Sequence, residues 1–316
     1  MRLFAKGRIN KGEKIIEVVS NYDVKSLVIS SIKGGVGKTG STMCLAGAFA
    51  EMRPDWNVMI IDCDSQANTS IALGFNPAEH TDNCLLYDIF DDPKNITLED
   101  CLWQTKIPNI YLAPADRGLY QKEAEIQLHG FSAIKETRTI LRDKVNEFKM
   151  SAKKNWLIMF DTRPDLGIFT LNAYLASDRV IIPVTPDEFA FQGIKIVDKT
   201  ITDIRNGGYN RDLRVLGIYR SLWEKANSHN TRLAEAELAT FTGNAVFNTF
   251  IPNHVSVRNA MRERLPVNFH AKYKNTDVSN AFRSLMEEVM GRWNTRVDMT
   301  RGSEAGVQEM RRSLSS

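Results

Sequence analysis

The sequence predicts an α/β fold, in which a doubly wound, mostly parallel sheet carries helices on both faces. Several short runs rich in Val, Ile and Leu lack the polar alternation of a half-exposed strand, as expected for parallel strands covered on both sides. Helical patterns lie between these runs, and strands that alternate with helices connect through right-handed crossovers. A glycine-rich segment, SIKGGVGKTG, follows the first run and indicates the P-loop NTPase type of this fold.

The elements follow one another along the chain in this alternating order. The predicted strands are Leu27–Ser31, Val58–Asp62, Trp156–Asp161, Val180–Val184, Val215–Tyr219 and the less apolar Ala245–Ile251. The clearest helix is predicted over Asp187 to Asn206, where apolar residues recur at steps of three and four before two glycines end the pattern. We expect one P-loop domain over residues 26–294. Residues 1–25 are a basic extension of uncertain structure, and residues 295–316 a tail that is flexible or a short helix.

Length and composition suit a protein with a full hydrophobic core, since 43% of the 316 residues are hydrophobic. Four cysteines, at positions 44, 63, 84 and 101, lack the paired short spacing of a metal or redox site. We therefore expect buried thiols in a reducing cytoplasm. No run approaches the roughly 18 uninterrupted apolar residues of a membrane span, and the N-terminus has no apolar signal region. These observations predict a soluble cytosolic protein.

The basic residues are unevenly distributed, although a net charge of +3 is too small to indicate a polyanionic partner by itself. Between Arg205 and Arg232, six basic residues stand against two acidic ones. Between His254 and Lys274, five basic residues stand against one acidic residue. Such runs are most often solvated faces, so their function depends on what else the sequence shows.

The glycine-rich segment has the composition of a phosphate-binding loop. Its glycines let several backbone N–H groups approach phosphate oxygens, because no Cβ is in the way. Lys38 can reach the β- and γ-phosphates from the start of a helix, and Thr39 offers a hydroxyl to Mg²⁺. Ile32 stands where the general pattern has a glycine, and Lys33 adds a cation that most such loops lack. The predicted nucleotide-binding residues here are Lys33, Gly34, Gly35, Val36, Gly37, Lys38, Thr39 and Gly40.

A glycine turn with two chance lysines is the alternative interpretation, and acidic residues downstream argue against it. Asp161 ends one predicted strand, at the edge where an open α/β sheet binds its ligand, and can hold a water bound to Mg²⁺. Asp62 and Asp64 end another strand, and they project to the same side if that strand stays extended. Aspartates at strand ends are also common turn formers. We expect Thr39 and Asp161 to serve Mg²⁺, with Asp62 as a further candidate.

Five motifs in this order and spacing identify a family resemblance. They are KGGVGKT, IIDCDSQANTS, FDTRPDLG, VIIPVTPDEFAFQGI and FIPNHVSVRNA. With a lysine at the head of the phosphate loop, a deviant Walker A motif, the chain resembles the ParA family of partition ATPases. The wider group includes MinD and the nitrogenase iron protein. The resemblance covers about residues 26 to 290, and both terminal extensions lie outside it.

The resemblance implies an ATPase with slow intrinsic turnover that uses ATP and Mg²⁺ in plasmid or chromosome partition. An ATP-dependent homodimer would bind double-stranded DNA without sequence preference, and a ParB-like centromere-binding partner would stimulate hydrolysis. The lysine matching Lys33 crosses the dimer interface, Lys38 holds phosphate and Asp64 matches a switch aspartate needed for hydrolysis, so these three are the catalytic candidates. Pro252 is a further predicted nucleotide-binding residue. A cytoplasmic, nucleoid-associated protein is expected, without a membrane.

The chain departs from the family pattern at five positions, and basic residues near the last motif are DNA-contact candidates. The departures are Gly40 for Thr or Ser, Ser65 and Ala67 for Pro and Gly, Arg163 for the first of two prolines, and Asn259 for an acidic residue. Two of the basic residues are one helical turn apart, so one face could meet phosphates. The predicted DNA-binding residues are Lys225, Arg258, Arg262 and Arg264.

Three other functions share parts of this pattern. A MinD-like membrane-associated positioning ATPase needs a terminal amphipathic helix, and the tail offers only a thin apolar stripe. A redox ATPase like the nitrogenase iron protein needs paired cysteines, which lie elsewhere in this chain. ParA-like positioning of other cargo would use the same ATP and DNA chemistry and stays open.

Overall fold

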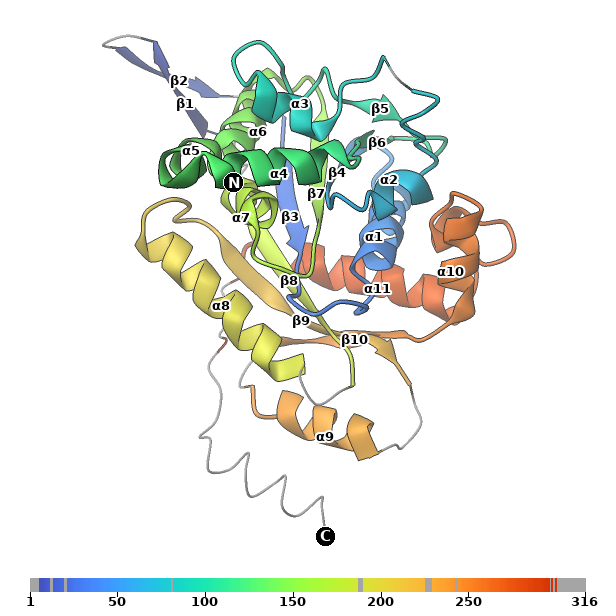
Figure 1. Cartoon of the computed structure of the whole chain (residues 1–316). Coiled ribbons are helices and arrows are strands. Elements are labelled where there is room, and N and C mark those ends of the chain that lie inside the picture. The colour runs from blue at the N-terminus through green and yellow to red at the C-terminus, as the bar shows by residue number, and fades with distance from the viewer. Residues whose placement is uncertain are drawn as a thin grey trace. The chain divides into compact units, whose positions relative to one another are not determined.

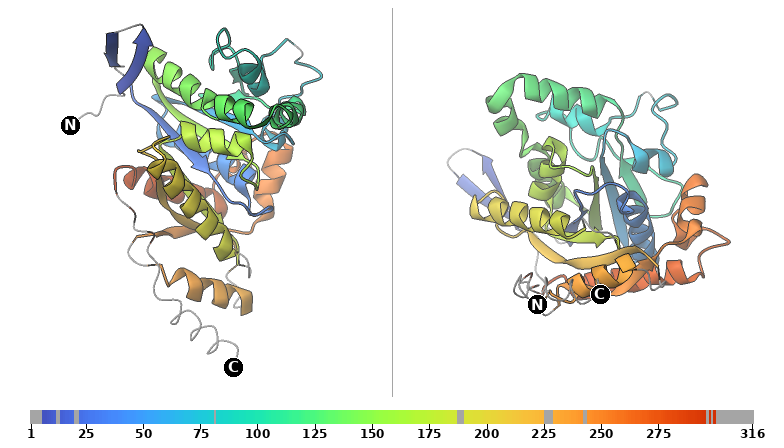
Figure 2. Two further views of the ribbon diagram at one scale, coloured as in Figure 1. Left: turned by 60° about the vertical axis from the view of Figure 1, so that its left-hand side comes forward. Right: turned by 60° about the horizontal axis from the view of Figure 1, so that its bottom comes forward.

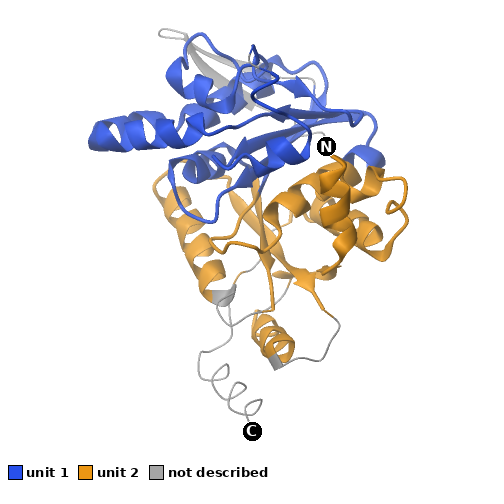
Figure 3. Cartoon of the chain, turned by 45° about the vertical axis from the view of Figure 1, so that its right-hand side comes forward, with its two compact units in different colours: residues 1–28, 49–178 blue, residues 29–48, 179–316 orange. Residues whose placement is uncertain are grey.

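The structure is a computed structural model that describes residues 6–11, 14–19, 22–80, 82–186, 190–224, 229–241, 244–295, 297 and 299 (Figure 1). The chain divides into two compact units (Figure 3). Unit 1 comprises residues 1–28 and 49–178, and unit 2 comprises residues 29–48 and 179–316. The main sheet has eight strands and is mostly parallel, so the predicted α/β class is confirmed.

Five strands of the main sheet belong to unit 1, in the order β3 (Val24–Ile29), β7 (Asn155–Thr162), β4 (Trp56–Cys63), β6 (Ile110–Ala113) and β5 (Trp103–Gln104). β4 runs parallel to β7 and β6, and every one of its residues is buried. β5 pairs antiparallel with β6. The sequence did not indicate β6 or β5, because runs of four and two residues are too short to show a pattern.

Six helices connect the strands of unit 1 among its described residues. They are α2 (Asn68–Ala72), α3 (Leu86–Asp91), α4 (Gly118–Leu128), α5 (Gly130–Thr137), α6 (Ile140–Ser151) and α7 (Ile168–Ala176). α7 is almost entirely buried. Part of the N-terminal extension forms a separate antiparallel pair, β1 (Lys6–Lys11) with β2 (Lys14–Val19).

Unit 2 holds three parallel strands, β8 (Arg179–Val184), β9 (Arg214–Trp223) and β10 (Val246–Pro252). α8 (Ala190–Asn206) and α11 (Asp277–Gly291) lie on opposite faces of these strands (Figures 1 and 2). The remaining helices are α9 (His229–Leu238), α10 (Val255–Arg262) and the 3₁₀ turn η1 (Val267–Phe269). α1 (Lys38–Met52) begins in unit 2 and ends in unit 1.

Helix α8 confirms the predicted amphipathic helix, whose first three residues, 187–189, lie outside the described residues. Ile194, Val197, Ile201 and Ile204 are all buried, as their spacing predicts. Nearly all of the predicted tail, 295–316, also lies outside the described part of the chain. Within the described residues, no helix is long and apolar enough to cross a membrane.

Two of the four cysteines depart from the expectation of buried thiols. Cys44 and Cys63 are buried and free, and burial raises the pKa of the Cys44 thiol to about 12. Cys84 and Cys101 instead form a disulfide, with their Cα atoms 4.5 Å apart. The expectation of four thiols is therefore wrong for this pair. No short spacing reveals this pairing, because the two cysteines are 17 residues apart and meet only in the folded chain, on either side of α3.

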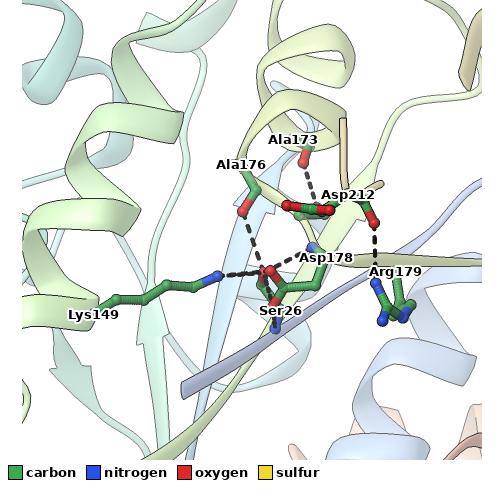
Figure 4. Close-up of polar contacts among 8 residues, drawn as sticks. Ser26, Lys149, Ala173, Ala176, Asp178, Arg179 and Asp212 are labelled. Carbon is green, nitrogen blue, oxygen red and sulfur yellow. Dashed lines mark hydrogen bonds and ion pairs between the residues drawn. The ribbon is translucent and has the colours of Figure 1, made fainter. Parts of the chain in front are cut away.

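The chain is anchored by polar contacts where it passes from unit 1 to unit 2 (Figure 4). At the end of unit 1, Asp178 accepts hydrogen bonds from the backbone N–H and the hydroxyl of Ser26, both at 2.8 Å. Lys149 forms an ion pair with the same carboxylate at 2.8 Å. Arg179, the next residue, donates to the carbonyl of Asp212 in unit 2 at 3.1 Å. Both sides of the 178–179 peptide bond are thus fixed, each within its own unit.

Candidate nucleotide site

The predicted phosphate loop lies in unit 2, between the end of β3 and the start of α1. Gly35 and Gly37 have φ angles of 75° and 82°, in the left-handed region that favours glycine. A Cβ on Gly35 would meet nothing within 4 Å, so its backbone conformation, rather than crowding, calls for glycine there. The loop therefore has the curled backbone that the sequence predicts for a phosphate cradle.

Lys38 points back into this loop from the first turn of α1. Its Nζ donates to the carbonyl oxygens of Ser31 at 3.2 Å and Lys33 at 3.1 Å, and the residue is only 8% exposed. The loop thus holds the ammonium group in place by its own main chain. The N-terminus of a 15-residue helix adds a positive dipole end at the same point, which favours an anion there.

Residues at the end of strand β9 contact the phosphate loop. Ser221 donates its hydroxyl to the carbonyl of Val36 at 2.7 Å, and a Cβ on Gly37 would approach Ser221 Oγ to 3.2 Å. The next residue, Leu222, has a positive φ of 52° and would lie 3.7 Å from the same Cβ. Sequence reasoning missed this support, because Ser221 lies 185 residues from its partner and nothing local marks it.

Three other residues predicted to bind the nucleotide are half-buried. Lys33 is half-buried, and its N–H donates to Ser31 Oγ at 3.2 Å. Thr39 is half-buried in the first turn of α1. Pro252 is half-buried at the end of β10, where it pairs with Trp223 of β9.

The predicted acidic residues lie in unit 1, where two of them form a buried pair. Asp62 and Asp161 stand opposite each other in the parallel register of β4 and β7, and they are 0% and 1% exposed. Burial and the neighbouring charge of Asp161 raise the pKa of Asp62. Hydrogen bonds from Ser70 and from the Asp64 N–H oppose this shift without cancelling it.

Two hydroxyl residues of α2 bind these carboxylates. Thr69 donates to Asp161 Oδ2 at 2.6 Å. Ser70 donates both its hydroxyl, at 2.7 Å, and its N–H, at 2.8 Å, to Asp62 Oδ2. Its hydroxyl oxygen also accepts from the N–H of Ala115 at 3.0 Å. Sequence reasoning quoted this segment as a motif but did not assign either hydroxyl a partner.

Asp64 lies outside this pair. Strand β4 ends at Cys63, so Asp64 begins a turn rather than extending the strand, and the extended backbone on which the same-side expectation depends is not present. Its Oδ1 accepts from the N–H of Gln66 at 2.9 Å, and its carbonyl accepts from the N–H of Ala67 at 2.8 Å. The side chain therefore shapes its own turn in this structure.

The acidic pair of unit 1 and the phosphate loop of unit 2 suit different ligands. No group of three or more His, Cys, Asp or Glu side chains able to hold a metal ion occurs among the residues that the structure describes. Two buried carboxylates that repel each other fit a divalent cation, and Mg²⁺ prefers such hard oxygen ligands while keeping waters and phosphate oxygens in its shell. The lysine-centred loop fits the phosphates themselves.

Comparison with known proteins decides the family. A family model described as "AAA domain" matches residues 24–215. The chain belongs to this family. The ParA chromosome partitioning protein of Caulobacter vibrioides is 29% identical over 274 residues, covering 87% of this chain and 97% of that protein. The Soj sporulation initiation inhibitor of Bacillus subtilis is 29% identical over 245 residues, covering 77% and 90%.

A solved structure shows the same fold. It is the cobyrinic acid a,c-diamide synthase of Mycobacterium smegmatis with an ATP analogue and magnesium. Its TM-score is 0.68 at 20% identity, and the match covers 89% of this chain and 100% of that one.

The predicted resemblance to ParA is confirmed, and the chain is a P-loop ATPase of the ParA/Soj family. Its 192 matched residues, 24 to 215, include the phosphate loop and all three candidate aspartates.

Two of the departures from the ParA pattern have a structural explanation in close packing and in backbone conformation. A Cβ on Gly40 would come within 3.2 Å of Val257 Cγ1 and 3.5 Å of Met261 Sδ, so glycine lets α10 pack directly on α1. Ala67 has a φ of 54°, which glycine adopts without strain and alanine does not. The family's glycine at this position would be relaxed where Ala67 is strained.

The other three departures have local roles or none. Arg163 forms ion pairs with Glu123 at 2.9 Å and Asp165 at 3.1 Å, which hold the loop after β7. Asn259 donates to the hydroxyl of Tyr273 at 3.3 Å. Ser65 is buried, and nothing in the structure explains it.

The predicted DNA-contact residues are exposed where they are described. Arg258 and Arg262 lie one turn apart on α10, and Arg264 follows that helix with a φ of 62°. All three are exposed. Lys225 lies outside the described residues.

Proposed function

We propose that the chain is a partition ATPase that binds MgATP, dimerises with ATP and then binds double-stranded DNA without sequence preference. The observation that carries this proposal is the preformed phosphate loop, in which the Lys38 ammonium is held by two loop carbonyls at the start of α1. An arriving polyphosphate would exchange these neutral partners for charged ones, so the loop favours a nucleotide over water.

Each candidate residue has a stated part in this proposal. Lys38 would bind the phosphates and Thr39 the metal, while Asp161, with Asp62, would accept hydrogen bonds from metal-bound water. When bound, Mg²⁺ neutralises charge on the β- and γ-phosphates. Asp64 orients the attacking water after leaving its own turn. Lys33 reaches the nucleotide of a second subunit, because a cation offered to the partner's phosphate makes dimerisation depend on ATP.

Packing of α10 on α1 links nucleotide to DNA in this proposal. Gly40 stands two residues after Lys38 and touches the inner face of α10, whose outer face presents Arg258 and Arg262. A monomer offers few phosphate contacts, so its binding should be weak. A dimer joins two such faces, and each added contact steepens the dependence on salt. Hydrolysis, stimulated by a ParB-like partner, would then release the protein from a nucleoid in the cytoplasm.

Nucleotide binding is tested with two variants that separate binding from turnover. Lys38→Ala removes the central cation and should abolish ATP binding. Asp64→Ala should bind ATP and dimerise but hydrolyse little, because the loop that holds the phosphates is intact. Equilibrium binding of a fluorescent ATP analogue and phosphate release measure the two steps. Tight ATP binding by Lys38→Ala would overturn the assignment of the loop.

DNA binding is tested by mobility shift on unrelated duplexes with ATP, ADP or no nucleotide, at low and moderate salt. We expect binding with ATP alone, and its loss when Arg258→Glu and Arg262→Glu are combined. Arg211→Glu, an exposed charge reversal elsewhere in unit 2, is the matched control. Equal binding in all three nucleotide states contradicts an ATP switch. Binding in none favours the membrane or other-cargo alternatives, which sedimentation with lipid vesicles separates.

A further inference from the structure

Helix α2 places two adjacent hydroxyls on two different aspartates. Thr69 holds Asp161, and Ser70 holds Asp62, at distances of 2.6 and 2.7 Å. All four side chains are at most 1% exposed. Water is therefore a poor substitute for either hydroxyl, and each hydrogen bond to a carboxylate in such a site is of the strong, charge-assisted kind.

We propose that Thr69 is a positioning residue for magnesium, acting through Asp161. The inference rests on the proposed function, in which Asp161 accepts from a water of the Mg²⁺ shell. A carboxylate that interacts through water must present its oxygen in one direction, and groups that hydrogen-bond to metal-binding side chains set that direction. Thr69 does so by holding Oδ2, which restricts rotation of the carboxylate before any cation arrives.

The acidic pair makes this positioning necessary. Asp62 and Asp161 are neighbours in register on adjacent strands, and two buried carboxylates at such positions repel each other. Without donors on both, the carboxylates would turn away from each other. The two hydroxyls are on one short helix, so the distance between the carboxylates that they hold is set before a cation binds.

A purely structural role for Thr69 makes a different prediction. If its hydroxyl only satisfied a buried carboxylate, its removal would lower stability and leave the magnesium requirement of nucleotide binding unchanged. If it positions Asp161, its removal shifts the metal requirement, and a hydroxyl restored at the same place recovers it.

The experiment titrates Mg²⁺ into the full-length chain with a fluorescent ATP analogue and records binding rather than turnover. Thr69→Val keeps the shape of the side chain and removes the donor, and it should raise the half-saturating Mg²⁺ concentration about 10-fold or more. Thr69→Ser should stay close to the unmodified chain. Thr170→Val is the control, because Thr170 is equally buried in unit 1 and its hydroxyl has no hydrogen-bond partner among the described residues.

The outcomes separate the inference from the function on which it rests. If the unmodified chain shows no magnesium-dependent nucleotide binding, the proposed function fails. If it does bind, and Thr69→Val has an unchanged Mg²⁺ requirement, the positioning role alone is overturned. Thermal unfolding checks each variant, and if Thr69→Val does not fold, Thr69→Ala removes the same donor without placing a methyl group against the carboxylate. A shift shared by Thr170→Val also counts against the inference.

Discussion

Two aspartates of unit 1 accept the same pair of hydrogen bonds from a serine, yet their pKa values shift in opposite directions. Asp62 accepts from the N–H and hydroxyl of Ser70 at 2.8 and 2.7 Å, and Asp178 accepts from the N–H and hydroxyl of Ser26, both at 2.8 Å. The pKa of Asp62 is nevertheless raised, while that of Asp178 is lowered. The serine pair therefore does not decide the outcome.

The sign of the neighbouring charge decides the direction of each pKa shift. Burial alone would raise the pKa of both carboxyls. Burial is the largest single influence on Asp178, but the charge and hydrogen bond of Lys149, together with the hydrogen bonds from Ser26, lower its pKa overall. Asp62 is fully buried beside a second acid, Asp161. Asp178 has a lysine beside it, whereas Asp62 has a second acid beside it. Under the proposed function, a bound cation would offset the repulsion within the acidic pair.

Among these variants, we expect Asp161→Asn to have the largest effect, because it removes the acidic neighbour that distinguishes Asp62 from Asp178. It removes the repelling charge yet leaves an oxygen for Thr69, so the metal-free protein should gain about 1–2 kcal/mol in free energy of unfolding. Magnesium-dependent ATP hydrolysis should fall by about 100-fold or more, because the charge that faces the metal shell is gone. Urea unfolding in EDTA and phosphate release measure the two effects. A variant that loses activity and also loses stability would show that Asp161 is structural.

Lys149→Met should remove the ion pair that lowers the pKa of Asp178. It leaves Asp178 without its cation, and because that carboxylate is partly exposed we expect a loss of about 1–3 kcal/mol rather than the larger cost of a fully buried charge. Nucleotide binding by the folded protein should be unchanged. Lys149→Arg keeps the charge and serves as the control in urea unfolding. Equal stability of Lys149→Met and the unmodified chain would contradict this account of Asp178.

The pH dependence of stability should differ in sign between the two aspartates. The pKa of Asp178 is below the ordinary value of 3.8, so its contribution is present above that pH and is lost as the pH falls through the folded pKa. The pKa of Asp62 is above 3.8, so the unfolded chain ionises first and Asp62 destabilises the protein increasingly as the pH rises. Asp178→Asn should therefore cost about 1 kcal/mol at pH 7 and less below pH 4.

Asp62→Asn should change the pH dependence of stability in the opposite direction. This variant should be more stable than the unmodified chain at pH 7, and the difference should vanish near pH 4. Urea unfolding of both variants at pH 3.5, 5 and 7, without metal, compares the slopes. Parallel slopes for the two variants would refute the contrast.

Ala67→Gly should have the smallest effect. Glycine adopts the φ of 54° without strain, which stabilises the turn before α2 by about 0.5–1 kcal/mol after the added freedom of the unfolded chain is subtracted. Gly74→Ala, at a φ of 97°, is the reverse control and should destabilise. A lower unfolding midpoint for Ala67→Gly would mean that the turn does not need its left-handed residue.

The sequence predicted those features that depend on neighbouring residues. The phosphate loop follows from glycines within four positions of each other, and helix α8 from its own periodicity. The six predicted strands all occur, because each is long enough to show an apolar run. Asp62 and Asp161 were selected by their place at strand ends, where topology alone brings them together.

Features that depend on distant pairs were not predictable. The Thr69 hydrogen bond spans 92 residues and the Ser221 bond spans 185, and a Thr or Ser in either segment looks like any other. The turn at Asp64 departs from an extended strand because its own side chain caps Gln66. The Cys84–Cys101 disulfide closes a loop whose ends meet only after folding.

Neither unit is a single stretch of polypeptide. The chain leaves unit 1 after residue 28, returns at residue 49 and leaves again after residue 178, so three peptide bonds join the two units. Truncation at any one point therefore yields no isolated unit, and a gene fragment cloned from residue 179 onward would lack the phosphate loop. To express unit 2 alone, residue 48 would have to be joined to residue 179 by a designed linker. Such a fused chain would carry the loop, α10 and its arginines without either aspartate of the acidic pair.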